Sequence, residues 1–183
     1  MPRPVIIGMN NPYPDPDGRY ALAPFPEGCA GHRLYRMLLE AAVMRDPAIT
    51  LMRKDYMDVF DRRNVLQQRT WSEAEARVAG RALLPTLLGR SVVVLGVATL
   101  RALGLPRPAP RPDAADDWCT WDTHHPTPDL LGREQESCAD TILYALLPHP
   151  SGRCREYNDF AMRRRAGELL LELYDREVRG YVG

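Results

Sequence analysis

Two short loops carry the side chains best suited to chemistry, one near each end of the 183-residue chain. The first, GMNNP, contains Asn10 and follows a β-branched run, and the second, PHPSG, contains His149 and follows an apolar run. An amide offers a hydrogen-bond donor and an acceptor side by side, and an imidazole can stabilise negative charge on a leaving group. Each loop alone is also typical of an ordinary turn. Asn10 and His149 are therefore candidate catalytic residues only if the fold brings them together.

Two further residues could complete a binding site for a flat, polar ring. Asn64 follows the segment Asp58–Arg63, and an asparagine amide can pair with the edge of a nucleobase. Phe25 is held between two prolines and could stack on a flat ligand. The simpler alternatives are a cap or turn for Asn64 and a core position for Phe25.

The elements that must position these residues follow from hydrophobic periodicity, which predicts four strands alternating with four helices. Such alternation predicts an α/β fold, a three-layer α/β/α sandwich around a mainly parallel four-stranded sheet, in one domain covering residues 1–183. Sheets of this kind bind ligands at the carboxyl ends of their strands, where both loops fall. The strands are expected at Val5–Ile7, Tyr56–Leu66, Ser91–Gly96 and Thr141–Leu147, and the helices at Ala30–Arg45, Ser72–Leu88, Ala98–Leu103 and from Asn158 or Asp159 onward.

Residues 105–137 are rich in proline, aspartate, tryptophan and histidine, and are expected to form a long irregular insertion. Its aromatic and imidazole side chains could widen a binding pocket. The pair His124-His125 could instead bind a metal, but two ligands without a supporting carboxylate are weak evidence, so we expect no metal and no cofactor. The side chains that could widen the pocket are Trp118, Trp121, His124 and His125.

Composition narrows the class of protein further. The formal net charge is zero, so any binding of nucleic acid must come from local arginines such as Arg163–Arg165. No apolar run approaches the roughly 20 residues that span a bilayer, and the N-terminus does not look like a secretion signal. We therefore expect a cytoplasmic monomer without a membrane partner. The four cysteines lack a CxxC pair and are expected to be free thiols: Cys29, Cys119, Cys138 and Cys154.

Taken together, these segments resemble the uracil-DNA glycosylase-like superfamily, most closely its small phage and bacterial members. GMNNP is similar to the first motif of that superfamily, in which a glycine stands two residues before a catalytic Asn or Asp. PFPEGCAGHRLYRML and SVVVLGVATLRALG resemble two stretches of its thermostable branch. PHPSGRCREYND is similar to the second motif and the DNA-wedging loop after it. The resemblance covers roughly residues 4–165, but it fits the insertion poorly and lacks the cysteine pattern of the iron–sulfur branch.

The resemblance implies a role for each matched residue. Asn10 would orient the attacking water, although Asn11 is extra relative to the family's GMNPG and competes for that position. His149 would stabilise the departing base anion, Phe25 would stack on the flipped base, and Asn64 would read its edge. Arg153 sits where the family inserts a side chain into the gap left in the duplex. The further expected contacts are Asn11 and Tyr13 to the base, and Ser151, Gly152, Arg153 and Arg155 to the DNA.

The expected activity is that of a monofunctional DNA glycosylase, which hydrolyses the N-glycosidic bond of a flipped pyrimidine and leaves an abasic site. A lyase step would need an amine, and only Lys54 and the N-terminus could supply one. The base is expected to be uracil or an enlarged pyrimidine, such as a glucosylated hydroxymethylcytosine in phage DNA, which would indicate a role in phage defence. Two alternatives stay open: a catalytically inert DNA-binding member of the same fold, and an enzyme that acts on free nucleosides or nucleotides.

Overall fold

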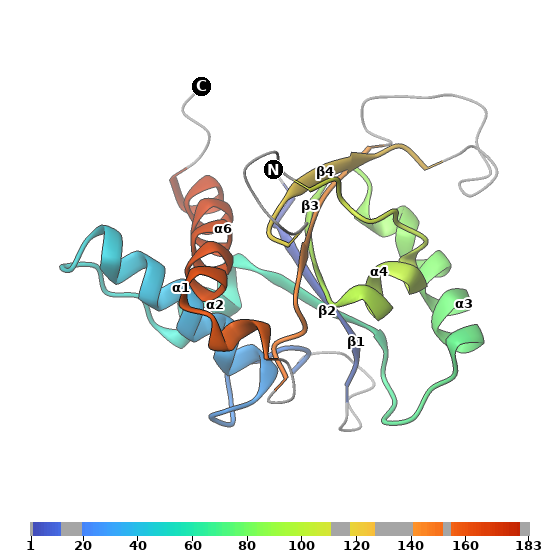
Figure 1. The fold of residues 1–183 in the computed structure, drawn as a ribbon, viewed down its shortest axis with the longest axis horizontal. Helices are drawn as coiled ribbons and strands as arrows, with labels where there is room; N and C mark the ends of the chain where they lie inside the picture. The colour runs from blue at the N-terminus through green and yellow to red at the C-terminus, as the bar shows by residue number, and fades with distance from the viewer. Residues whose placement is uncertain (1, 12–19, 111–117, 127–140, 152–154, 180–183) are drawn as a thin grey trace.

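The chain folds around one five-stranded sheet (Figure 1). The computed structural model describes residues 2–11, 20–110, 118–126, 141–151 and 155–179. The strands are β1 (Val5–Asn10), β2 (Asp61–Leu66), β3 (Ser91–Leu95), β4 (Trp121–His124) and β5 (Ile142–Leu147). The helices are α1 (Ala30–Arg45), α2 (Arg53–Val59), α3 (Glu73–Leu83), α4 (Val97–Leu103) and α6 (Phe160–Arg179), with short 3₁₀ turns at Leu84–Leu87 and Glu156–Asn158.

The strand order is β2-β1-β3-β5-β4, in which the first four strands are parallel and β4 is antiparallel to β5. The predicted mainly parallel sheet is thus confirmed, but the predicted number of four strands is wrong. The fifth strand, β4, comes from the insertion that we expected to be irregular. It forms because Trp121–His124 pairs with the outer edge of β5, which would otherwise leave its backbone groups unpaired.

Side chains alternate between two apolar clusters, one on each face of the sheet. Ile6 and Leu95 belong to the cluster that includes residues of α1, α2 and α6, whereas Ile7 and Val94 belong to the cluster that includes residues of α3 and α4. Figure 1 shows these two groups of helices on opposite sides of the sheet. This arrangement of helices on both faces is compatible with the expected three-layer sandwich.

Helix bounds follow local signals closely, with two exceptions. Helix α1 covers the predicted range Ala30–Arg45, and α3 begins after Ser72, whose side chain forms a capping box with Glu75. The predicted end of this helix at Leu88 is wrong, because α3 ends at Leu83 and a 3₁₀ turn follows. The predicted strand from Tyr56 to Leu66 is wrong in its first half, because residues up to Val59 form helix α2. Tyr56 and Val59 stand three residues apart and are both buried, as one face of a helix requires.

No helix within the described ranges combines the length and the apolar character needed to cross a bilayer.

Candidate active site at the carboxyl edge of the sheet

The strand register places the predicted site residues toward the carboxyl edge of the sheet. Gly8 of β1 lies beside Asn64 of β2, and Leu95 of β3 lies beside Leu147 of β5. Because side chains alternate along a strand, residues two positions further along point to the same face. Asn10 stands two residues beyond this row within β1, so its side chain belongs to the face covered by α1 and α6. His149 follows the end of β5 by two residues, at the same carboxyl edge of the sheet.

Asn64 is the polar residue of this row, and its environment is unusual. Its side chain is buried, with 7% of its surface exposed, and its Oδ1 has no hydrogen-bond partner among the described residues. The oxygen lies over Gly8, where an added Cβ would approach it to 2.9 Å. A buried acceptor without a partner costs about 1–3 kcal/mol. Asn64 therefore holds an unused hydrogen-bonding group at a position where the neighbouring strand has no side chain.

The amide of Asn10 is held in one orientation by the loop after β2. Its Nδ2 donates to the backbone carbonyls of Gln68 and Arg69, each at 3.2 Å. Since carbonyl oxygens only accept, the donor side of the amide must face this loop. The oxygen Oδ1 is then the atom of Asn10 that remains available as an acceptor.

Asn11 takes a different position from Asn10. Its backbone N–H donates to the carbonyl of Leu66 at 3.0 Å, so the pairing with β2 continues by one residue. Its side chain is buried, and by the alternation of the strand it belongs to the same face as Met9, which packs in the α3 and α4 cluster. Of the two competing amides, Asn10 is the one that shares a face with Asn64.

His149 sits on a rigid turn directly after β5. Tyr157 donates from its hydroxyl to the carbonyl of Pro148 at 2.7 Å, and the backbone N–H of Ser151 donates to the carbonyl of His149 at 2.8 Å. Burial lowers the pKa of His149 below its ordinary value, because desolvation disfavours the imidazolium. The imidazole has no hydrogen-bond partner within the described part of the chain. The turn thus presents a neutral ring whose nitrogens are unpaired among the described residues.

Gly96 makes room for His149 at the end of β3. Its backbone has φ 82° and ψ 151°, a region that essentially only glycine adopts, and its N–H donates to the carbonyl of Leu147 at 2.7 Å. A Cβ on Gly96 would lie 3.2 Å from the Cβ of His149. Sequence reasoning did not assign this glycine to the site, although its place at the end of an apolar strand is a usable signal.

The gap between Asn10 and His149 is set by the strand order. Strand β3 lies between β1 and β5 and turns away into α4 at Gly96. Two strand spacings of about 4.8 Å each separate the flanking strands by roughly 10 Å. The strands that lead to Asn10 and His149 therefore flank a turn at which Gly96 has no side chain.

Phe25 lies on the segment that approaches Gly8 from the α1 side. Leu22 would contact a Cβ on Gly8 at 3.5 Å, and Arg62 holds the segment by donating to the carbonyl of Ala21 at 2.9 Å. Phe25 itself is 45% exposed and packs edge-to-face on Tyr20 with ring centroids 6.1 Å apart. The alternative core position for Phe25 is therefore wrong, and its ring is accessible to a ligand.

The expected DNA contacts are only partly within the described residues. Tyr13, Gly152 and Arg153 lie outside them, as do Cys138 and Cys154. Ser151 is half-buried and Arg155 is exposed, next to the His149 turn.

Two arginines at the start of α6 form ion pairs within the protein, Arg163 with Glu40 and Arg164 with Glu168. The Asp159 carboxylate caps the first turn of α6 by accepting from the N–H of Ala161 at 2.9 Å, so a negative charge already occupies this helix start.

The two histidines of the insertion lie at the opposite edge of the sheet from the candidate site, which differs from the prediction. β4 runs away from the carboxyl edge, so His124 pairs with Ile142 at the amino end of β5, and His125 contacts the hydroxyl of Thr141 at 3.2 Å. Trp121 pairs with Ala145 in mid-strand, and Trp118 packs between the two core clusters. Among the described residues, no three His, Cys, Asp or Glu side chains gather as metal ligands would.

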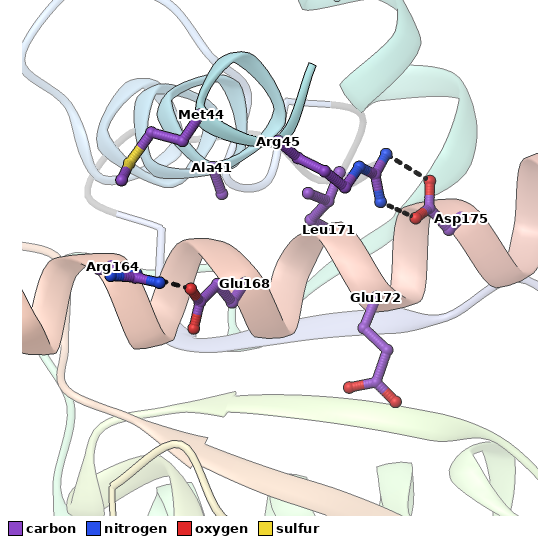
Figure 2. A pocket seen from close by; sticks show the side chains of 8 residues that line it. All are labelled: Ala41, Met44, Arg45, Arg164, Glu168, Leu171, Glu172 and Asp175. Carbon is purple, nitrogen blue, oxygen red and sulfur yellow. Dashed lines mark hydrogen bonds and ion pairs between the residues drawn. The ribbon is translucent and has the colours of Figure 1, made fainter.

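A separate cavity of about 500 Å³ lies between α1 and α6, away from this edge. Figure 2 shows that four of its charged side chains form two pairs, Arg45 with Asp175 and Arg164 with Glu168. The fifth, Glu172, pairs with Arg176 outside the lining. Oppositely charged partners in contact leave little charge with which to recognise a ligand. None of the predicted site residues lines this cavity.

No family model matches the chain, and no curated protein matches it significantly.

Proposed function

We propose that the protein is a monofunctional DNA glycosylase that hydrolyses the N-glycosidic bond of a flipped pyrimidine. The observation that carries the proposal is the shared edge: the accessible oxygen of Asn10, the unpartnered Oδ1 of Asn64 and the neutral imidazole of His149 all lie toward the carboxyl ends of three parallel strands. Ligand sites of open α/β sheets lie at such strand ends. The resemblance of the two loops to the uracil-DNA glycosylase-like superfamily supports the same activity.

Each side chain has a role that suits its environment. The Asn10 amide is fixed by two carbonyls, so its Oδ1 can accept a hydrogen bond from the attacking water without rearrangement. The Oδ1 of Asn64 can accept from an N–H at the edge of a pyrimidine, which would satisfy the buried acceptor. Phe25 offers an exposed ring on which the flipped base can stack.

The reaction needs stabilisation of charge more than a strong base. Water oxygen bonds to the sugar C1′ as the C1′–N bond breaks, the base leaves with the bonding electrons, and the proton of the water passes to solvent. A neutral His149 can donate its ring N–H to the oxygen of the departing base anion, in a site where burial strengthens that interaction. Asn10 cannot take up the proton as a carboxylate would, so its contribution is to place the water.

An oligonucleotide panel tests the proposal and identifies the base. Oligonucleotides would carry uracil, a thymine mismatch, hydroxymethylcytosine or glucosylated hydroxymethylcytosine, and alkali cleavage would report abasic sites. We expect excision of at least one base, and a loss of about 10²-fold or more in Asn10→Ala and His149→Ala with unchanged melting temperatures. Asn11→Ala is the matched control for the neighbouring amide and is expected to lose far less.

The outcomes separate the proposal from its alternatives. Binding of DNA without abasic products would favour an inert DNA-binding member, and release of base from mononucleotides alone would favour a nucleoside enzyme. Wild-type excision in both Asn10→Ala and His149→Ala would reject the assignment of these residues. Borohydride should trap no protein–DNA adduct, because neither candidate amine, Lys54 or the N-terminus, belongs to the GMNNP or the PHPSG loop.

A further inference from the structure

A second pocket opens at the same edge of the sheet, on the face covered by α3 and α4. Its volume is about 210 Å³, below the roughly 300–1,000 Å³ of a site for a drug-sized ligand, so it suits a single ring system. Met9 and three alanines give it an apolar lining, and Trp71 forms part of its wall with 37% of its surface exposed. The lining residues are Met9, Trp71, Glu73, Ala76, Arg77, Ala98, Arg101 and Ala102.

Short connections join this pocket to the Asn10 site. Met9 lines the pocket, and the next residue of β1 is Asn10. The carbonyls that orient the Asn10 amide belong to Gln68 and Arg69, in the loop that leads directly to Trp71. A strand of nucleic acid that places one base beside Asn10 therefore has the pocket within reach across the tip of β1.

The charge at the pocket favours an anionic, planar ligand. Arg101 is exposed and lines the pocket, and it makes no ion pair within the described residues. Arg77 also lines it and pairs with Glu73 at 2.8 Å, but both side chains are more than half exposed, so solvent screens this pair. An indole face beside a free guanidinium is the combination that stacks unpaired bases and neutralises phosphate in proteins that bind single strands.

We infer that this Trp71–Arg101 pocket binds a second nucleotide of the strand that carries the excised base, with the base stacked on Trp71 and its phosphate beside Arg101. This inference rests on the proposed function, because it assumes that DNA crosses the carboxyl edge. It adds a subsite that holds the strand on the far side of β1 from the flipped base, and it predicts a preference for unpaired DNA around the target.

Binding and cross-linking of single-stranded oligonucleotides test the subsite. Labelled strands would be titrated by fluorescence anisotropy, and strands with one 5-iodouracil at successive positions would be photo-cross-linked and the attached residue found by mass spectrometry. We expect a cross-link at Trp71 and about tenfold weaker binding in Trp71→Ala and Arg101→Ala. Trp71→Phe keeps a stacking ring and should retain most of the affinity.

Arg81→Ala is the matched control, because Arg81 is exposed near the other end of α3 and has the same charge. Trp71 also precedes the cap of α3, so loss of binding that tracks a lower melting temperature in Trp71→Ala would indicate a structural role. Arg101→Ala does not share that role. Equal affinities of Arg101→Ala, Arg81→Ala and the wild type would overturn the subsite.

The same strands distinguish this inference from the proposed function. Excision without a cross-link at Trp71 and without loss of affinity in the variants would reject the subsite and leave the glycosylase in place. A cross-link at Trp71 with no abasic product from any target would keep the subsite as part of a DNA-binding surface and reject the glycosylase. Absence of binding to every oligonucleotide would reject both.

Discussion

At the residue scale, Asn64 lowers the stability of the free protein but offers a hydrogen-bond acceptor to a bound base. A buried acceptor without a partner is destabilising by about 1–3 kcal/mol, whereas the same oxygen would be satisfied by a base in the site. Such a residue is expected to serve function at the expense of stability.

We predict that Asn64→Ala changes the free energy of unfolding by less than about 1 kcal/mol, because the lost packing is offset by removal of the unpaired oxygen. Excision should fall by about 10²-fold. Leu38→Ala, a fully buried apolar control, should lose about 2–5 kcal/mol. Urea unfolding and single-turnover excision provide the two measurements, and a loss of stability equal to that of Leu38→Ala would count against the role of Asn64.

Gly8 gives the second test at this scale. An added Cβ would stand 2.9 Å from the Asn64 Oδ1, so Gly8→Ala must displace the amide. We predict that excision falls about tenfold or more while stability falls by about 1–3 kcal/mol. Combining Gly8→Ala with Asn64→Ala should remove most of the extra steric cost, which a double-mutant cycle of unfolding free energies can measure. Strictly additive effects would show that the two residues do not interact.

At the scale of elements, the turn from β3 to α4 supports the His149 turn. Gly96 has a backbone conformation closed to other residues and touches His149, whereas Gly104, at the other end of α4, has φ 73° and open space around it. A substitution at Gly104 therefore introduces backbone strain alone, whereas a substitution at Gly96 introduces strain and also a contact with His149.

We predict that Gly96→Ala destabilises the protein by about 1–3 kcal/mol and also lowers excision, because His149 must shift. Gly104→Ala should destabilise it by about 1 kcal/mol and leave excision unchanged. Thermal unfolding and excision rates of both variants test whether the β3–α4 turn positions His149. Equal excision in the two variants would mean that the β3–α4 turn does not position the imidazole.

At the scale of the whole molecule, three titratable groups of the described residues contribute to the response of stability to pH. Burial lowers the pKa of His149 and of His124 below 6.5, with His125 adding to the effect on His124. The pKa of Asp61 lies below 3.8: burial opposes this shift, but hydrogen bonds from Arg63 and Arg90 outweigh it.

The sign of the stability change follows from proton uptake. Above pH 6.5 the two histidines are neutral in both states; as pH falls, the unfolded chain binds protons first, so the free energy of unfolding decreases through the lowered pKa values. The contribution of Asp61 persists down to about pH 3.8 and is lost below it. We predict that the double variant His124→Gln, His149→Gln loses less stability than the wild type between pH 7 and 5, measured by urea unfolding. An identical decrease would contradict the burial of these rings.

Excision by the wild type should stay level through pH 6.5 and fall only at lower pH, through the lowered pKa of His149, because the proposed step uses the neutral ring.

Much of this protein was readable from the sequence alone. Periodicity and caps located α1, β3 and α4, because these signals act between residues a few positions apart. The same local chemistry singled out Asn10, Asn64 and His149, since amides and an imidazole at strand ends are few. The sequence predicted a strand from Tyr56, where the structure has the end of helix α2. The β-branched and aromatic residues there suit a strand equally well, and only burial of one helix face in the tertiary structure decides between the two.

Only the tertiary structure decided how these pieces meet. The order β2-β1-β3-β5-β4 places the strands that lead to Asn10 and His149 on either side of one turn, and no local pattern specifies strand order, which depends on packing between distant segments. The pairing of β4 moved His124 and His125 to the opposite edge, and the loop after β2 fixed the direction of the Asn10 amide. Sequence determined which groups are present, and long-range pairing determined which of them face one another.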